Sequence, residues 1–378
     1  MQELFKAAVE RGASDIHIKA GDYMRARIHG ELQPLTQQKL TVDQVRGIAM
    51  QLIPHEDERE NFDRILDYDC SWGIPGVGRF RVNIMKQRGS PMIVMRAIPI
   101  EIPSVEDLGL PAIVNRIAAF ERGLILVTGV TGSGKSSTQA AMINWMNHHK
   151  QQHIVTLENP IEFLHRDNQC SITQRDIGTD TDSFQTGLRS VLRQDPDVIL
   201  IGEMRDKTTI ETALKAAETG HLVISTLHTR NAVQTISRII AVFEPSEQEM
   251  IRVRLSESLQ AVISQRLVQK REGGRTAAME VMLMTGTIRD CVRDQDRMEE
   301  ISDLIAEGRS VYGSQTFDQH LMELVKSGQV DFDVAKAAAN NPSDFDLQMN
   351  MLGGGAPRGA GPQGTQGLAD EMSNMMGG

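Results

Sequence analysis

The stretch that decides the fold is GLILVTGVTGSGKSS, residues 123–137. Its aliphatic residues 124–127 predict a buried strand, and the glycines at 129, 132 and 134 interrupt any regular element before a segment of helical composition begins. Residues 129–136 match the spacing GxxxxGK[ST], in which glycines let successive backbone N–H groups turn toward a phosphate. The stretch therefore predicts a strand, a phosphate-binding loop and a helix.

The loop also supplies the side chains that a bound nucleotide needs. Lys135 would neutralise the β and γ phosphates, and Ser136 would ligate Mg²⁺. The alternative is a glycine-rich turn with a solvated lysine. The residues that we expect to contact the nucleotide are Gly129, Thr131, Gly132, Ser133, Gly134, Lys135, Ser136 and Ser137.

Working outward, short apolar runs alternate with segments of helical period. The runs are residues 124–128, 154–157, 198–201 and 222–226. Such runs between helices are typical of a mostly parallel sheet covered on both faces, so this part is predicted to be α/β. Beyond residue 230 the chain is predicted to be helical, for example over 248–267, with Ile251, Leu255, Leu259, Val262 and Ile263 on one face.

The N-terminal part has a different pattern. A short helix is expected over residues 2–12, and the alternation in 24–32 and 79–85 predicts half-buried strands, with a hairpin turn at Gly30. Prolines at 99, 103 and 111 indicate a linker. The predicted domains are 1–98 (α+β), 99–111 (linker) and 112–352 (α/β with a helical C-terminal part), followed by a disordered Gly/Met-rich tail, 353–378.

Composition excludes several classes of protein. The 378 residues carry 40 Lys and Arg against 50 Asp and Glu, a net charge of -10, which disfavours a nucleic-acid partner. The three cysteines are far apart in the sequence, and no apolar run approaches the ~20 residues that cross a bilayer. We expect a cytoplasmic protein with no transmembrane segment and no signal peptide.

Acidic residues follow two of the predicted strands, where ligands bind in open α/β sheets. Glu203 comes after 198–201, and is a candidate for the Mg²⁺ shell and the water network. Glu158 and Glu162 follow 154–157, and either could polarise an attacking water. The alternative for each is a solvated surface glutamate.

Two histidines bracket the fourth predicted strand. His221 precedes residues 222–226 and His228 follows them. A lone histidine is more often structural, but these two could sense a γ phosphate or pair with a carboxylate.

In this order, these segments resemble the secretion-ATPase superfamily, and within it the PilT/PilU type of type IV pilus retraction motor. Residues 12–18, GASDIHI, are similar to the N-terminal signature of that family. Residues 129–136 resemble its Walker A loop, 156–162 its Asp box, 198–206 its Walker B segment and 219–229 its His box. The resemblance covers nearly the whole chain to about residue 350.

The resemblance implies a PAS-like N-terminal domain and a RecA-like ATPase domain in a hexameric ring that hydrolyses ATP with Mg²⁺. It favours Glu162 over Glu158 as the catalytic glutamate, and implies that His221 and His228 link nucleotide state to movement. Arg81 and Arg96 would reach the nucleotide of a neighbouring subunit, although both could merely solvate a sheet face. Arg189 and Arg193 also match arginines near the family's site.

Two departures bear on function. Asn159 stands where the family usually has an acidic residue, and residues 286–293 are a degenerate form of a helix found in PilT. Asn159 could weaken hydrolysis or alter a contact around the site, whereas residues 286–293, together with 315–318 and 342–351, favour a PilU-like paralogue. The expected function is a hexameric motor for pilus retraction in twitching motility, peripheral at the inner membrane and partnered by the pilus platform protein and a paralogous pilus ATPase. The alternatives are a poorly hydrolysing regulatory ring subunit and a ring ATPase that translocates nucleic acid.

Overall fold

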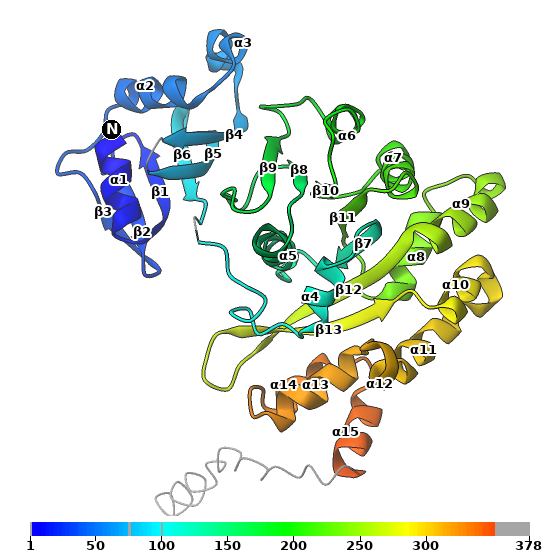
Figure 1. Cartoon of the computed structure of the whole chain (residues 1–378). Coiled ribbons are helices and arrows are strands. Elements are labelled where there is room, and N and C mark those ends of the chain that lie inside the picture. Colours follow the sequence, from blue (N-terminus) through cyan, green and yellow to red (C-terminus); the bar gives the residue numbers. More distant parts are fainter. Residues whose placement is uncertain (1, 75–76, 100, 352–378) are drawn as a thin grey trace, which may run out of the picture. The chain divides into compact units, whose positions relative to one another are not determined.

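The computed structural model describes residues 2–74, 77–99 and 101–351, and the predicted disordered tail, 353–378, lies outside them. The chain divides into two compact units, one formed by residues 1–267 and 276–316, the other by 268–275 and 317 onward. The first unit holds two sheets (Figure 1). The predicted domain boundaries at 98 and 111 are not tested by this division and stay predictions.

The first sheet has six strands in the order β3-β2-β1-β6-β5-β4. Phe5 of α1, Val45 of α2 and the inward residues of the strands form its core, and Gly30, at φ +87°, makes the predicted turn between β2 and β3. The opposite face is mainly polar, although Met85, Met92 and Val94 also lie on it. The elements are α1 (Gln2–Glu10), β1 (Ala13–Lys19), β2 (Arg25–Ile28), β3 (Glu31–Pro34), α2 (Val42–Leu52), α3 (Glu56–Glu60), β4 (Asp67–Ile74), β5 (Gly78–Gln87) and β6 (Ser90–Ala97).

The second sheet has seven strands in the order β13-β12-β7-β11-β10-β8-β9. The predicted strands are confirmed as β7 (Gly123–Thr128), β8 (His153–Glu158), β10 (Val198–Ile201) and β11 (Leu222–Leu227), and they pair in parallel. Sequence reasoning did not find the other three, β9 (Ser171–Asp176), β12 (Leu259–Gln269) and β13 (Arg275–Leu283).

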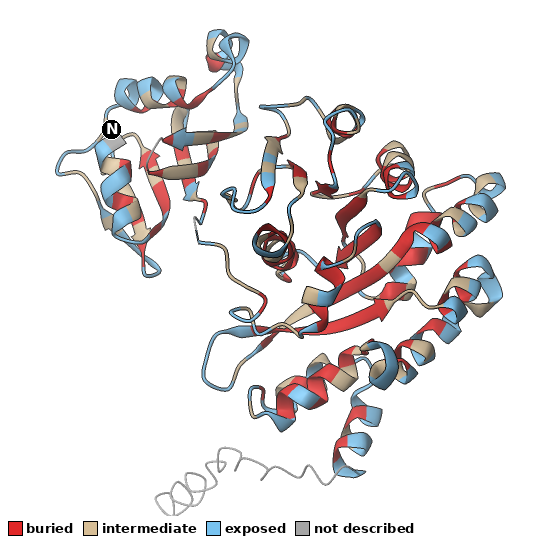
Figure 2. Cartoon of the chain, viewed as in Figure 1, coloured by how far each residue is buried: buried red, intermediate tan, exposed pale blue. Residues whose placement is uncertain are grey.

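Helices cover both faces of this sheet, as the continuous apolar runs predict, and β7, β10 and β11 are buried along their whole length (Figure 2). Residues of α4 and α5 pack on one face, and residues of α6 to α11 pack on the other. The helices are α4 (Ile113–Ala118), α5 (Lys135–His149), α6 (Phe184–Val191), α7 (Lys207–Glu218), α8 (Ala232–Ile240), α9 (Pro245–Ser258), α10 (Gly286–Arg293), α11 (Ile301–Glu307) and α12 (Arg309–Tyr312).

The predicted helix over 248–267 is wrong in its second half. Helix α9 ends at Ser258, and the chain continues directly into β12, which pairs in parallel with β7. The apolar residues Leu259, Val262 and Ile263 fit a helical period, but the run 261–263 is also rich in β-branched residues, which suit a strand buried on both faces. Tertiary pairing with β7 decides between the two.

The second unit is built from α13 (Phe317–Lys326), α14 (Phe332–Ala338) and α15 (Pro342–Met351). Phe332 and Phe345 contact each other with ring centroids 6.0 Å apart, and Lys336 Nζ lies 2.7 Å from Asp346 Oδ2. Across the described residues, no helix is long and apolar enough to cross a membrane.

Candidate active site

The phosphate loop lies between the carboxyl end of β7 and the start of α5. Gly129, Gly132 and Gly134 have φ values of +146°, +77° and +91°, a region that favours glycine. A Cβ at Gly129 would lie 2.3 Å from the backbone oxygen of Gln265 and 2.5 Å from Ser133 Oγ. The first glycine of the motif is therefore required by space as well as by conformation.

The start of α5 fits a phosphate. Gly134 is its N-cap and has a left-handed conformation, and no side chain caps the first N–H groups of the helix. Uncapped N–H groups and the helix dipole together form an anion site. The hydroxyl oxygen of Ser133, nearly fully buried, has no partner among the described residues and can donate a hydrogen bond to a phosphate oxygen.

Lys135 lies within this loop. Its Nζ donates hydrogen bonds of 3.0 Å to the backbone oxygens of Gly129 and Val130. Burial lowers the pKa of Lys135, and the carboxylates of Glu162 and Glu203 act in the opposite direction. The charges of two of the three predicted carboxylates therefore act on the loop lysine.

Glu158 has a different setting from Glu162. Its Oε1 accepts hydrogen bonds from Thr156 Oγ1 at 2.7 Å and from Gln174 Nε2 at 3.0 Å, and burial raises its pKa. The Glu162 side chain is exposed, in a turn that contains a cis peptide bond between Asn159 and Pro160. The carboxylate of Glu158 is therefore engaged in hydrogen bonds within the chain, whereas that of Glu162 is accessible to solvent.

Glu203 follows β10, two residues beyond Ile201, and its side chain is 25% exposed. Arg205 Nε lies 2.7 Å from Glu203 Oε2, and His228 Nε2 lies 3.6 Å from the same oxygen. His228 therefore lies close enough to Glu203 to pair with it, as predicted for a histidine at the end of the fourth strand.

His221 lies elsewhere. It precedes β11, and its backbone oxygen accepts a hydrogen bond from Gly123 N at the beginning of β7, whereas the phosphate loop follows the other end of β7. Its Nδ1 lies 2.9 Å from the backbone oxygen of Ala216. At about 3.3 Å per residue, β11 separates His221 from His228 by roughly 20 Å. The structure therefore does not bring the two histidines together.

Arg81 and Arg96 lie on the polar face of the six-stranded sheet. They are directly opposite each other on β5 and β6, and Asp15 on β1 is opposite Arg96. Arg96 Nε donates to Asp15 Oδ1 at 2.9 Å, although the arginine side chain is 70% exposed. Arg81 is exposed and has no ion pair within the described part of the chain. The N-terminal signature thus supplies the acid that holds one of the two arginines.

Arg189 and Arg193 lie at the C-terminal end of α6 and just beyond it. Both are exposed, and Arg193 Nη1 donates to the backbone oxygen of Arg189 at 3.0 Å. They precede β10, so they lie toward the edge of the sheet where His221 is found, and the fold does not bring them to the phosphate loop of their own chain.

Two site residues were missed because their strands were missed. Gln174 on β9 donates to Glu158 Oε1 and to the backbone oxygen of Phe163 at 2.9 Å, and accepts from His165 N at 2.8 Å. Gln265 on β12 contacts the phosphate loop. Neither belongs to a motif, and only knowledge of the strand order would have placed them at the site.

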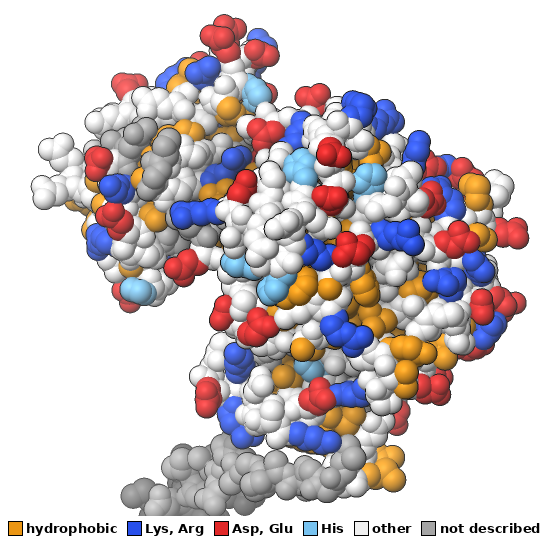
Figure 3. Space-filling view, in the orientation of Figure 1, with side chains coloured by type: hydrophobic (Ala, Val, Ile, Leu, Met, Phe, Trp, Pro, Cys, Tyr) orange, Lys and Arg blue, Asp and Glu red, His pale blue; other side chains and the backbone are white. Residues whose placement is uncertain are grey.

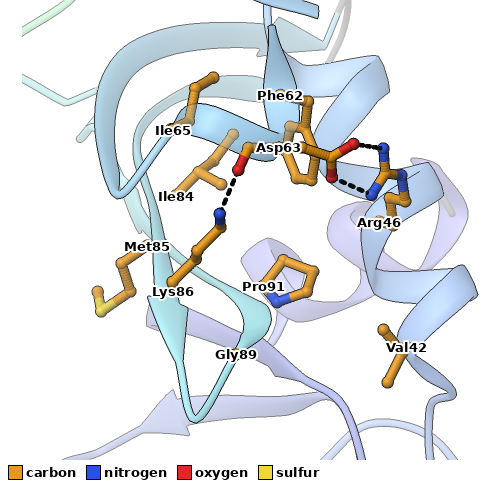
Figure 4. A pocket seen from close by; sticks show the side chains of 10 residues that line it. All are labelled: Val42, Arg46, Phe62, Asp63, Ile65, Ile84, Met85, Lys86, Gly89 and Pro91. Atoms are coloured by element: carbon orange, nitrogen blue, oxygen red, sulfur yellow. Dashed lines mark hydrogen bonds and ion pairs between the residues drawn. The ribbon is translucent and has the colours of Figure 1, made fainter.

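A separate hollow of about 120 Å³ lies beside α2 and β5 (Figure 4). Its two cationic side chains are already engaged, because Arg46 pairs with the Asp63 carboxylate and Lys86 Nζ donates to the Asp63 backbone oxygen. No predicted site residue lines it. The lining residues are Val42, Arg46, Phe62, Asp63, Ile65, Ile84, Met85, Lys86, Gly89 and Pro91.

Comparisons with known proteins identify the family of this chain. The family model described as type II/IV secretion system protein matches residues 1–333. The chain belongs to this secretion-system family. Among family members, the type IV pilus retraction ATPase PilT of Pseudomonas aeruginosa is 43% identical over 343 residues, which are 91% of this chain and 99% of PilT.

Two further matches agree with the predicted resemblance to PilT and PilU, which is confirmed. The type IV pilus ATPase PilU of Pseudomonas aeruginosa is 37% identical over 377 residues, covering 99% of this chain and 94% of PilU. A crystal structure of the pilus retraction motor PilT with bound ADP matches with a TM-score of 0.83 and 42% identity, over 92% of this chain and 99% of that one. This secretion-family chain therefore has the predicted fold, a PAS-like α+β part followed by a RecA-like α/β part.

Proposed function

We propose that the chain is a Mg²⁺-dependent ATP hydrolase that works as a hexameric motor in type IV pilus retraction. The observation that carries the proposal is the phosphate loop itself, in which three glycines have positive φ, Lys135 is buried and the first N–H groups of α5 are uncapped. The names of the similar proteins, a pilus retraction ATPase and a retraction motor with bound ADP, support the same activity.

Each residue has a chemical role in this proposal. The N–H groups of residues 129–136 and Lys135 Nζ bind the β and γ phosphates and offset their charge. Ser136 Oγ and Glu203 would hold Mg²⁺, and the ion would offset the negative charge of the phosphates. Glu162 orients the attacking water, while His228 beside Glu203 reports the state of the γ phosphate.

Glu162 is preferred to Glu158 because of what each carboxylate already does. Glu158 accepts two side-chain hydrogen bonds, and the raised pKa that burial gives it disfavours the carboxylate form that a base needs. Glu162 is exposed and its charge acts on Lys135. Glu158 instead holds the turn that presents Glu162.

Arg81 and Arg96 complete the site in our proposal by reaching the nucleotide of the adjacent subunit. Both side chains are exposed on a sheet face of their own chain, as a group that acts on a neighbour must be. Such an arginine can contribute about 10³- to 10⁵-fold to phosphoryl transfer. His221, at the far end of β11 from His228, would act across the same boundary.

The ring would act from the cytoplasm as a peripheral component of the pilus base. Its partners would be further copies of the chain, the inner-membrane platform protein and a paralogous pilus ATPase. Basic and acidic side chains alternate on the face seen in Figure 3, with no continuous basic stripe there, in keeping with the net charge of -10. This charge distribution disfavours the nucleic-acid translocase, and ATPase activity that is unchanged by added DNA would set it aside.

A second candidate is a regulatory ring subunit that hydrolyses poorly without its paralogue. Asn159 in the turn before Glu162 favours it, since the side chain there is exposed and neutral.

The experiment that separates the two candidates is steady-state ATP hydrolysis by the purified chain across protein concentrations, with particle size measured in the same buffer. A self-sufficient motor gives turnover that rises as hexamers form and is lost in Glu162→Gln. A chain that binds ATP and forms hexamers yet barely turns over, and gains activity when a paralogous ATPase is added, is the regulatory subunit. A chain that fails to bind ATP contradicts both.

A further inference from the structure

Strand β12 runs beside β7 and continues past the base of the phosphate loop. Ser264 on β12 is paired in register with Thr128, the last residue of β7, and Thr128 Oγ1 donates to Ser264 Oγ at 2.9 Å. Gln265 therefore comes next to Gly129, where the loop begins. The buried Gln265 therefore lies against a loop whose other features follow from the loop's own residues.

Gln265 contacts both ends of the loop. At the beginning, its backbone oxygen is so close to Gly129 that a Cβ there would lie 2.3 Å away. At the end, its Nε2 donates a 2.7 Å hydrogen bond to the backbone oxygen of Ser133, and a Cβ at Gly134 would lie 3.1 Å from the same nitrogen. The loop is thus packed against Gln265 at its first glycine and hydrogen-bonded to it at Ser133, just before its last glycine.

The position of the Gln265 side chain has a cost in the free energy of folding. The residue is 3% exposed, and its Oε1 is buried with no hydrogen-bond partner among the described residues. A buried amide oxygen without a partner destabilises a fold, so an apolar residue of similar size would pack at least as well here. Among the described residues, the hydrogen bond to Ser133 is the one side-chain hydrogen bond of Gln265, and it offsets this cost.

We propose that Gln265 is a positioning residue for nucleotide binding, which holds the Ser133–Gly134 peptide so that the loop N–H groups and the start of α5 face the phosphates before nucleotide arrives. The proposal rests on the proposed ATP site. It differs from a packing role because it depends on the Nε2–H donor and not on the volume of the side chain.

Three variants of the full-length chain separate the two roles. Gln265→Met keeps the length and removes the donor, Gln265→Glu keeps the shape and replaces the donor with an acceptor facing the Ser133 oxygen, and Gln265→Asn keeps the amide on a shorter chain. Gln269→Met, at an exposed position of the same strand, is the matched control.

The measurements are the equilibrium Kd for ADP, the KM and kcat for ATP, and the melting temperature without nucleotide. We expect Kd and KM to rise about tenfold in Gln265→Met and further in Gln265→Glu, as expected for one lost hydrogen bond and for an added repulsion. We expect kcat at saturating ATP to stay within about threefold of the parent, and Gln269→Met to change nothing.

The outcomes are distinguishable. If Gln265→Met binds ADP as the parent does, or if melting temperature falls in all three variants in proportion to Kd, the positioning role is wrong and Gln265 is a packing residue. If Gln265→Asn retains more affinity than Gln265→Met at equal melting temperature, the donor role is supported. If the parent chain itself does not bind ADP, the proposed function fails and this inference fails with it.

Discussion

Arg96 and Asp15 lie opposite each other on neighbouring antiparallel strands, and Arg96 Nε donates to Asp15 Oδ1 at 2.9 Å. The aspartate is nearly buried, with 11% of its side chain exposed, whereas the arginine is 70% exposed. The acid therefore restrains the arginine at its base and leaves the guanidinium edge accessible. Although burial alone would raise the pKa of Asp15, the hydrogen bonds from Arg96 and Ser14 and the charge of Arg96 bring it below its usual value.

Substitution of Asp15 should therefore reduce turnover through Arg96. We expect Asp15→Asn to lower kcat of the assembled protein about ten- to hundredfold, the scale of a catalytic group that is misplaced by about 1 Å. The matched control is Asp22→Asn, another acid of this region, which pairs with Arg25 and Lys19. Equal kcat values in the two variants would remove the positioning role of Asp15.

Sites shared between subunits should be restored by mixing. Lys135→Ala and Arg81→Ala are each expected to be inactive alone, because one lacks the loop lysine and the other the arginine offered to its neighbour. Random 1:1 rings should leave about a quarter of the interfaces complete, so roughly a quarter of the parent ATPase rate should return. The control mixes Lys135→Ala with Glu162→Gln, two groups of the same chain's site, and should restore nothing. Restoration in the control, or its absence in the test pair, contradicts a shared site.

Gln174 joins β9 to the turn that carries Glu162, through hydrogen bonds to Glu158, Phe163 and His165. Gln174→Met removes these bonds at nearly constant volume, so the turn should lose its fixed position. We expect kcat to fall about tenfold while the Kd for ADP stays unchanged, because the phosphate loop is untouched. Ser171→Ala, an exposed change on the same strand, is the control. A parallel rise in Kd would show that the effect is not confined to the turn.

His165 gives a prediction about pH. Burial lowers its pKa to about 4, and its Nδ1 has no hydrogen-bond partner in the described part of the chain. The native state therefore keeps the ring neutral where the unfolded chain, with a pKa near 6.5, binds a proton. Stability should fall as pH falls from about 6.5 toward 4.

This contribution of His165 can be measured by denaturant unfolding at several pH values. Between pH 6.5 and 5.5 the loss should be roughly 1 kcal/mol, and it should be absent in His165→Gln. His148→Gln, at an exposed position, should keep the loss. A parent and a His165→Gln variant with the same pH dependence would show that the pKa of His165 is the same in the folded and unfolded states.

Sequence reasoning succeeded where a local rule acts alone. The strand, loop and helix of residues 123–149 were predictable because glycine conformation and a continuous aliphatic run leave little choice. The polar placement of Arg81 was predictable from alternation along β5. These features need no knowledge of neighbouring strands.

Sequence reasoning failed where pairing between strands decides which element forms. The run 259–263 satisfies a helical period, yet it forms a strand because β7 offers an open edge beside it. β9 is half exposed and carries weak alternation, so its Gln174 was invisible as a site residue. Likewise, the link between Asp15 and Arg96 spans two strands that are far apart in the chain, and only the sheet order brings them together.

The positions of His221 and His228 change how the sequence motif that contains them should be read. The motif is eleven consecutive residues, 219–229, but the six residues of β11 in its middle are all buried. The two ends of the motif therefore lie at opposite ends of a strand. Groups that share no partner and lie roughly 20 Å apart contribute independently to free energy. Within one chain, the effects of substituting the two histidines should therefore add, and any departure from additivity would measure communication through the assembled ring.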